Sequence, residues 1–166
     1  SGCSSEQASQ ALASGDLTKL FSPNIWFEIN GAGDVLINIV RAEMGQHVGT
    51  SLAQIVADEL GADWSKVSFK HVDTDSKWGV MVTGGSWSVH TSFTLLSQAG
   101  AAGRTVLIDA ASKLMGVAAE TCSAENGVVT SGAKSLTFAE IVSNGDFSRT
   151  ISEEELAAMP VKAPAD

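Results

Sequence analysis

The sequence predicts an α+β domain in which one amphipathic helix and one long helix pack on a small mixed sheet with a β-hairpin. Three observations predict this fold. Residues 25–39 alternate apolar and polar side chains around a glycine-containing turn, as a β-hairpin does. Helical periodicity follows at 51–60 and again from 83 to 114, and Asn126-Gly127 is a strong hairpin signal. With 44% hydrophobic residues among 166, the chain can bury one core.

The first hairpin turns between Gly31 and Asp34. Its apolar side chains fall on one face, at Ile25, Phe27, Ile29, Val35, Ile37 and Ile39. The pair Gly31 and Gly33 is part of a dinucleotide-binding pattern, but that pattern requires a helix after the glycines. Because a strand pattern follows here, we exclude a dinucleotide site.

The amphipathic helix has a capping-box spacing at Ser51 and Gln54, and Gly61 ends it. Its apolar face consists of Leu52, Ile55, Val56 and Leu60. Two further strands are expected, at 67–72 and, after a polar loop, at 78–82.

The long helix begins after the segment 83–88, and small or apolar residues recur along it at spacings of three and four. These residues are Phe93, Leu96, Gly100, Gly103, Leu107, Ala110 and Leu114. Glycine at the centre of such a stripe weakens an isolated helix but allows another backbone to approach closely. We therefore expect this stripe to present apolar and glycine surface that another polypeptide covers.

Beyond Asn126-Gly127 the elements become short. Capping boxes start two helices, at Thr137 with Glu140 and at Ser152 with Glu155. These helices end near Asn144-Gly145 and Pro160. The domain therefore spans 21–160, between a flexible leader at 1–20 and a linker at 161–166.

Composition excludes several classes of function. A net charge of −9 with only 10 Lys and Arg argues against a nucleic-acid partner, and no apolar run approaches the roughly 20 residues that span a bilayer. Cys3 and Cys122 are too few for an iron–sulfur cluster, and His47, His71 and His90 lack metal-ligand spacing. No nucleophile motif is present. We assign no catalytic and no metal-ligating residue.

Two segments could contact a ligand. In 83–88, glycines let backbone N–H groups point outward, and Ser86 and Ser88 add hydroxyls at a helix N-terminus, which suits an anion or a polar ring. The alternative is a simple turn in which Ser86 or Ser88 caps the helix. Gln46 lies in a polar bend, where its amide could reach a ligand or merely be solvated.

Four motifs in order carry a resemblance to a known family. They are Glu43-Met44-Gly45-Gln46-His47-Val48-Gly49-Thr50, Asp73-Thr74-Asp75, Thr83-Gly84-Gly85-Ser86-Trp87-Ser88 and Ala99-Gly100-Ala101-Ala102-Gly103-Arg104. From about Pro23 to the tail, the chain resembles the large subunit of isoquinoline 1-oxidoreductase and related membrane-associated aldehyde dehydrogenases. These are molybdenum hydroxylases of the xanthine dehydrogenase and aldehyde oxidase family. The resemblance implies part of their molybdenum cofactor-binding fold.

The resemblance also implies which residues touch the cofactor, molybdopterin, in a mononucleotide or a cytosine dinucleotide form. The contacts to the pterin or its phosphates would come from Met44, Gly45, Gln46, Gly85, Ser86, Trp87 and Ser88. The family pattern has Gly directly after the Gln, whereas this chain has His47. That difference concerns how closely the backbone at 47 can approach the cofactor.

The implied function is oxidative hydroxylation of aldehydes or N-heterocycles by a larger enzyme of which this chain is an N-terminal fragment. The family's catalytic glutamate lies far downstream, so the fragment alone should be inactive. On this reading 21–160 is a partial molybdopterin-binding domain and 161–166 leads to the rest of the large subunit.

The implied partners are the remainder of the large subunit, an iron–sulfur subunit that holds the clusters, and a cytochrome c subunit as in the membrane-associated relatives. Membrane association would come only through partners or a removed N-terminal segment. We expect the periplasm or the periplasmic face of the membrane, with the cytoplasm as the alternative.

Two other functional classes compete with this reading. One is a non-catalytic periplasmic module that binds an organic anion at 85–88. The other is a structural subunit that packs on a partner along Gly100 and Gly103.

Overall fold

The computed structural model describes residues 18–149 and 151–162. Its larger sheet has the order β1 (Leu20–Phe21), β2 (Phe27–Asn30), β3 (Val35–Ile39), β4 (Val67–His71). The pairs β1–β2 and β2–β3 are antiparallel and β3–β4 is parallel. The predicted mixed sheet and its hairpin are confirmed. Of the predicted leader, 1–17 lies outside the described residues, and Leu20 pairs with Asn30.

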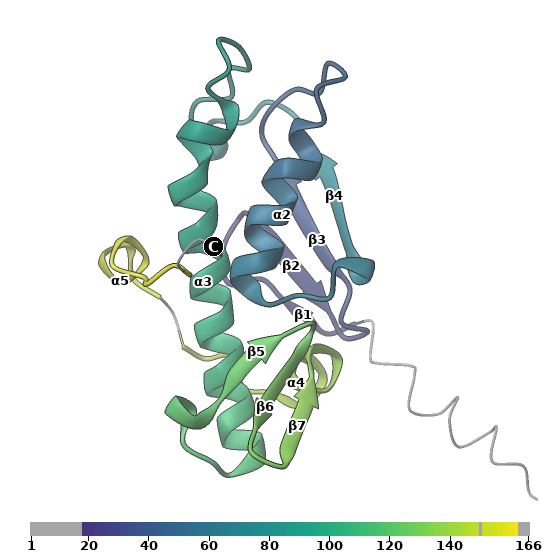
Figure 1. Cartoon of the computed structure of the whole chain (residues 1–166), viewed down its shortest axis with the longest axis vertical. Helices are drawn as coiled ribbons and strands as arrows, with labels where there is room; N and C mark the ends of the chain where they lie inside the picture. The colour runs from purple at the N-terminus through teal and green to yellow at the C-terminus, as the bar shows by residue number, and fades with distance from the viewer. Residues whose placement is uncertain (1–17, 150, 163–166) are drawn as a thin grey trace, which may run out of the picture.

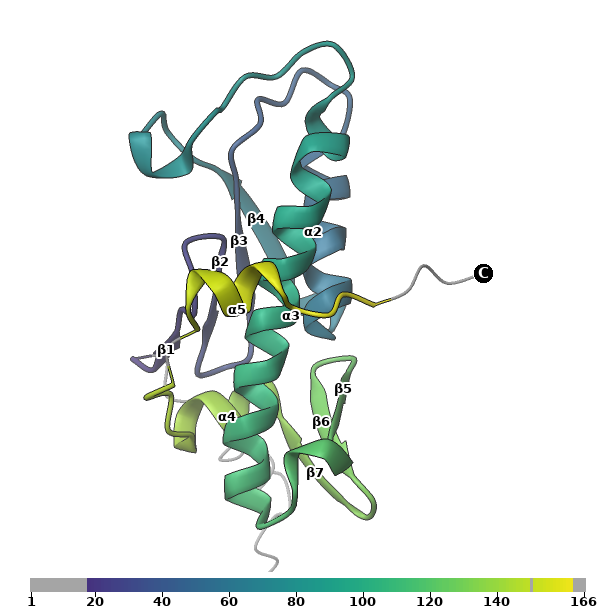
Figure 2. The same ribbon diagram turned by 90° about the vertical axis from the view of Figure 1, so that its left-hand side faces the viewer.

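Two helices pack against each other and on one face of this sheet (Figures 1 and 2). Helix α2 (Val48–Leu60) connects the parallel strands, and α3 (Ser88–Met115) lies beside it. The predicted capping box at Ser51 is wrong, because α2 begins one turn earlier and the Ser51 hydroxyl donates to the His47 carbonyl at 3.3 Å. The predicted end is confirmed, since Gly61 adopts φ 76°.

The core lies between the sheet and the two helices. Alternate residues of β2 and β3 point into it, which is the periodicity of the predicted hairpin. Its fully buried side chains include Phe27, Ile29, Ile37, Ile39, Leu52, Val56, Leu60 and Leu107.

The glycine stripe of α3 is packed against the chain itself. A Cβ atom on Gly100 would lie 2.8 Å from the Val56 carbonyl oxygen of α2, and one on Gly103 would lie 2.3 Å from Cζ of Phe27. The expectation that another polypeptide covers this stripe is therefore wrong for its centre. Only the ends are exposed, Phe93 by 49% and Leu114 by 43%.

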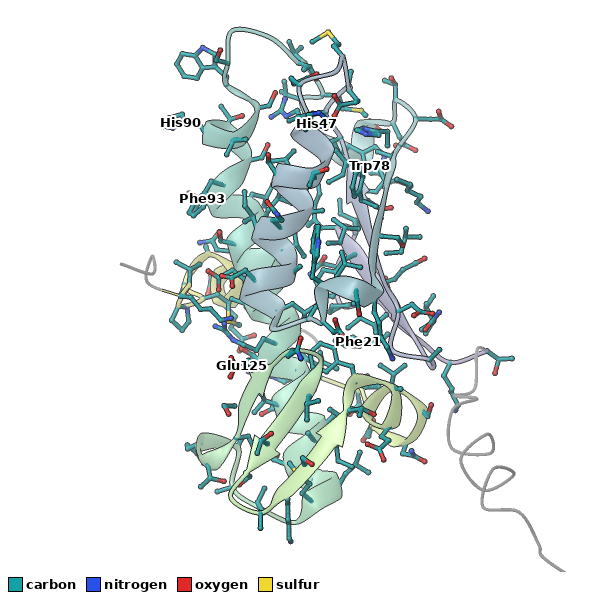
Figure 3. All side chains as sticks on the ribbon, turned by 45° about the vertical axis from the view of Figure 1, so that its right-hand side comes forward. Phe21, His47, Trp78, His90, Phe93 and Glu125 are labelled. Atoms are coloured by element: carbon teal, nitrogen blue, oxygen red, sulfur yellow. The ribbon has the colours of Figure 1, made fainter. Side chains whose placement is uncertain are left out.

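The strand predicted at 78–82 is also wrong. Its first residue, Trp78 (labelled in Figure 3), ends the 3₁₀ turn η2 (Ser76–Trp78), and no regular structure follows up to 84. Trp78 turns into the core, Gly79 breaks the extended chain with φ 70°, and Val80 and Val82 are exposed by 75% and 72%. Without a neighbouring strand edge, the alternating valines form no ladder.

A second, smaller sheet lies near the C-terminal half of α3 (Figure 1). It is an antiparallel meander of β5 (Ser123–Glu125), β6 (Val128–Ser131) and β7 (Lys134–Thr137), of which β7 was not predicted. Asn126 and Gly127 form the predicted hairpin turn, with φ 50° and 75°.

The remaining elements are short. They are η1 (Trp64–Lys66), η3 (Ala119–Thr121), α4 (Phe138–Asn144) and α5 (Glu153–Ala157). Both predicted capping boxes are present at the starts of α4 and α5. Helix α5 crosses α3, as Figure 2 shows.

The segment after α5 is fastened to both long helices. The backbone N–H of Lys162 donates to the buried carboxylate of Glu59 in α2 at 2.9 Å, and the Arg104 guanidinium of α3 donates to the Pro160 carbonyl at 3.3 Å. Of the predicted linker, only 161 and 162 are described, so the linker stays a prediction.

Candidate functional site

The two segments singled out in the sequence come together. The loop 42–47 precedes α2 and the loop 83–87 precedes α3, and Figures 1 and 2 both show them side by side at one end of the molecule. They form a groove of about 440 Å³. It is lined by Met44, Gln46, Val48, Thr83, Gly84, Gly85, Ser86, Ser88 and Val89. Of the predicted site residues, only Gly45 and Trp87 are not in its lining.

Arg41, at the end of β3, ties the loops to the sheet. Its guanidinium donates to the Val82 carbonyl and, at 3.0 Å, to the Thr91 hydroxyl of α3. Next to it, the backbone N–H of Ala42 donates to the Thr83 hydroxyl at 2.7 Å. These bonds hold the groove in place between the end of the sheet and the start of α3, although its walls are loops.

Glu43 organises the first loop, and the sequence analysis gave it no role. One carboxylate oxygen accepts from the backbone N–H groups of Gly45 at 2.8 Å and His47 at 2.9 Å, and the other from Gly49 at 3.4 Å. Desolvation raises the pKa of Glu43, but these three bonds and the nearby His47 outweigh it, so the pKa is lowered. An acidic residue just before a glycine bend and a helix start was the available signal.

Gln46 lines the groove, but its amide is folded onto its own loop. The side-chain oxygen accepts from the Met44 N–H, and the side-chain nitrogen donates to the Ala42 carbonyl at 3.0 Å. One N–H and one lone pair of the amide are left for a ligand.

His47 stands where the resemblance implies a glycine, and its backbone adopts a conformation that glycine favours. It is the N-cap of α2 with φ 57°, in the left-handed region, and Gly45 before it has φ 90°. The substitution therefore leaves the path of the loop as a glycine would set it.

The start of α3 has no side-chain cap. Its N-cap is Trp87, and neither Ser86 nor Ser88 accepts a hydrogen bond from the first turn. The capping alternative for these serines is therefore wrong. Gly85 and Ser86 both have φ 61° and form the turn that leads into the helix. The hydroxyls of Ser86 and Ser88 and the helix N-terminus thus lie together at the groove.

Gly84 is not explained by packing within the described chain. A Cβ atom there would have nothing within 4 Å, and its φ is not in the positive range that favours glycine. A glycine with free space above it lets a ligand approach the backbone closely.

The described residues contain no group of three or more His, Cys, Asp or Glu able to hold a metal ion. Within 18–149 and 151–162, moreover, no helix is long and apolar enough to cross a bilayer. The groove presents hydroxyl groups, one amide, backbone N–H groups and the uncapped N-terminus of α3. This set suits an anion or a polar ring.

Comparison with known proteins gives a clear result. Residues 4–161 match the molybdopterin cofactor-binding domain family. The chain is 47% identical over 146 residues to the membrane-bound aldehyde dehydrogenase [pyrroloquinoline-quinone] of Gluconacetobacter polyoxogenes, with 88% of this chain covered. It is 33% identical over 132 residues to isoquinoline 1-oxidoreductase subunit beta of Brevundimonas diminuta, with 74% covered.

The fold is similar to a solved structure as well. Quinoline 2-oxidoreductase from Pseudomonas putida 86 superposes with a TM-score of 0.51 at 27% identity, over 70% of this chain and 15% of that one. The chain spans 19% of the Gluconacetobacter protein and 17% of the Brevundimonas protein.

Proposed function

Because this chain belongs to the molybdopterin cofactor-binding domain family of molybdenum hydroxylase large subunits, we propose that its groove binds the pterin or phosphate part of that cofactor. The single observation that carries the proposal is that 42–47 and 83–87, far apart in sequence, line one groove. The match over 4–161 favours this role over a free-standing anion-binding module.

The chemistry of the lining supports the assignment. Helix α3 begins at the groove without a side-chain cap, and its N-terminus carries partial positive charge that stabilises a phosphate, whereas the N-terminus of α2 is already bonded to the Glu43 carboxylate. Ser86 and Ser88 add donors, and Gly84 leaves room at the backbone. Gln46 can donate and accept once each toward a pterin ring.

The cofactor would supply oxidative hydroxylation of a carbon centre, and this chain's part would be to hold and orient it. The relatives named above carry aldehyde dehydrogenase and isoquinoline oxidoreductase in their names, so we propose aldehydes or N-heterocycles as the substrate class. The residues that perform the reaction would lie in the rest of a large subunit. Without them, this chain should be inactive.

We further propose that the assembled enzyme includes an iron–sulfur subunit and a cytochrome c subunit and acts at the periplasmic face of the membrane. The name of the Gluconacetobacter relative specifies pyrroloquinoline quinone. For this chain we propose molybdopterin instead, because the family match covers most of its length. Molybdenum analysis separates the two cofactors, since the quinone contains no metal.

The test uses Gln46→Ala and Ser86→Ala in the complete protein that carries this chain. Each change removes a hydrogen bond to a buried polar or charged group, worth about 1 to 3 kcal/mol. We expect roughly tenfold to hundredfold weaker cofactor affinity. Molybdenum content, pterin content and melting temperature are measured together on each variant.

Gln98→Ala and Ser131→Ala are the matched controls, because both residues lie outside the groove. The controls should retain full cofactor. All four variants should stay folded, with Gln46→Ala slightly less stable because its amide makes two hydrogen bonds within its own loop. Full molybdenum loading in the double variant Gln46→Ala with Ser86→Ala would show that these residues only shape a turn. Bound quinone without molybdenum would refute the cofactor assignment.

A further inference from the structure

The fold contains a second cavity, which shares no lining residue with the groove. It is a cavity of about 220 Å³ between the end of β3, the segment 76–80 and the start of α3. Its apolar walls include Trp26, Ile39, Leu52, Trp78 and Leu96. No step of the proposed cofactor role uses it.

The apolar walls of the cavity belong to the packed core. The five apolar residues named above are all buried, and the rings of Trp26 and Trp78 are 5.8 Å apart. Protein interiors are close-packed, and an apolar cavity of about 150 Å³ can bind benzene. The volume here therefore fits a single aromatic ring with a short substituent.

One polar group of the wall has an unused donor. Ser92, only 6% exposed, accepts from Arg41 through Nε at 3.4 Å and Nη2 at 3.3 Å. Its own hydroxyl proton has no acceptor among the residues that the structure describes. A buried hydroxyl normally uses its donor as well, so Ser92 can donate to an acceptor inside the cavity.

The cavity favours a neutral ligand. Arg41 is the one charged residue in the described lining, and its guanidinium is already shared among Val82, Thr91 and Ser92. Burying a carboxylate against two tryptophans and three aliphatic side chains would need a free cation. A carbonyl oxygen needs only one donor.

We propose that this cavity binds a small neutral aromatic molecule of one ring that carries a carbonyl-type acceptor, with Ser92 donating to that acceptor. The ring would contact the side chains of Trp26, Trp78, Leu52 and Leu96, which all line the cavity. Val80 and Leu95 are the exposed apolar lining residues and form the rim. This site does not depend on the cofactor assignment.

The test is a titration of the chain with acetophenone, followed by the indole N–H resonances of its four tryptophans. Trp26 and Trp78 line the cavity and should shift together, whereas Trp64 and Trp87 lie on the surface and should not. Isopropenylbenzene has the same shape without the oxygen, so it should bind several-fold to about tenfold more weakly. Benzoate should not bind.

Variants test the hydrogen bond from Ser92 and the space inside the cavity separately. Ser92→Ala should reduce acetophenone affinity to that of isopropenylbenzene, while Ser97→Ala, a buried serine of the same helix outside the cavity, should have no effect. Leu95→Trp should block both probes, and Leu114→Trp, an exposed leucine farther along α3, should block neither.

Three results would overturn the proposal. These are equal shifts at all four indoles, equal affinity for the two neutral probes in the parent chain, and binding of benzoate as tight as that of acetophenone. The rim variant keeps the test decisive even if Ser92→Ala does not fold.

Discussion

Gly100 and Gly103 lie in the middle of α3, whereas Gly45 and Gly84 lie in the loops that form the groove, and their surroundings are opposite. A Cβ atom on either helix glycine would come within 2.8 Å of α2 or β2, but one on either loop glycine would meet nothing within 4 Å. The helix glycines are needed for packing inside the chain. The loop glycines leave space that no described residue fills.

The largest effect is expected from adding a methyl group to each of the two packed helix glycines. In Gly100→Ala with Gly103→Ala, the added methyl groups collide with backbone at Val56 and with the buried ring of Phe27. Overpacking costs about 1 to 3 kcal/mol at each site, and better helix propensity returns up to about 1 kcal/mol each. Because the two contacts, at 2.8 Å and 2.3 Å, are far too short for a methyl group, we expect the upper part of the resulting range, a net loss of about 2 to 4 kcal/mol of unfolding free energy, measured by urea denaturation. An unchanged midpoint would mean that α3 does not pack on α2 and β2 as described.

The next largest effect is expected at Gly84, one of the two loop glycines. Gly84→Ala meets no neighbour in the described chain, so stability should be unchanged or slightly higher. In the complete protein, the methyl group should keep the cofactor from the backbone and weaken loading about tenfold, or ~1.4 kcal/mol. Molybdenum per subunit and melting temperature are compared with the parent. Full loading would show that Gly84 is a spacer without a ligand.

Titration of Glu43 should affect the N-terminal end of α2 and leave its C-terminal end unchanged. Its pKa is lowered in the folded chain, so its contribution to stability is present above the ordinary glutamate pKa and is lost as pH falls through the lowered one. The amide resonances of Gly45, His47 and Gly49 should titrate together in this acid range. Glu43→Gln should abolish that titration and loosen the loop, whereas amides at the Gly61 end should not respond. Persistence of the titration in the variant would assign it to another group.

The smallest effect is expected at His47. Its backbone is already in the left-handed region, so His47→Gly removes strain but makes the unfolded chain more flexible. The two contributions nearly cancel, and we expect less than about 0.5 kcal/mol of change in thermal unfolding. His47→Val should instead lose about 1 kcal/mol or more, because a β-branched residue tolerates this conformation poorly. Equal stability of all three would show that the loop relaxes to another conformation.

Local patterns predicted much of the fold. The alternation around Gly31, the hairpin at Asn126-Gly127 and the capping boxes at Thr137 and Ser152 are all present. Each depends on neighbours a few residues apart, whose conformational preferences operate before any tertiary contact. The ordered motifs also indicated the family, which the match over 4–161 shows.

Tertiary contacts decided the rest. The valines of 78–82 alternate like a strand, but a strand also needs a partner edge, and Trp78 is instead buried in the core. The glycine stripe indicated a close approach without naming its partner, which proved to be α2 and β2 of the same chain. Glu43 acquires its role only when the loop folds around its carboxylate.

The sequence alone determined most of the element types, the family and the two segments that form the groove, because these follow from short-range periodicity and local motifs. Only the tertiary structure brought 42–47 beside 83–87, through Arg41 at the end of β3 and the pairing of α2 with α3. The same packing enclosed the cavity beside Ser92. Both hollows depend on contacts between residues some 40 to 50 positions apart, and such contacts leave no periodic trace in one sequence.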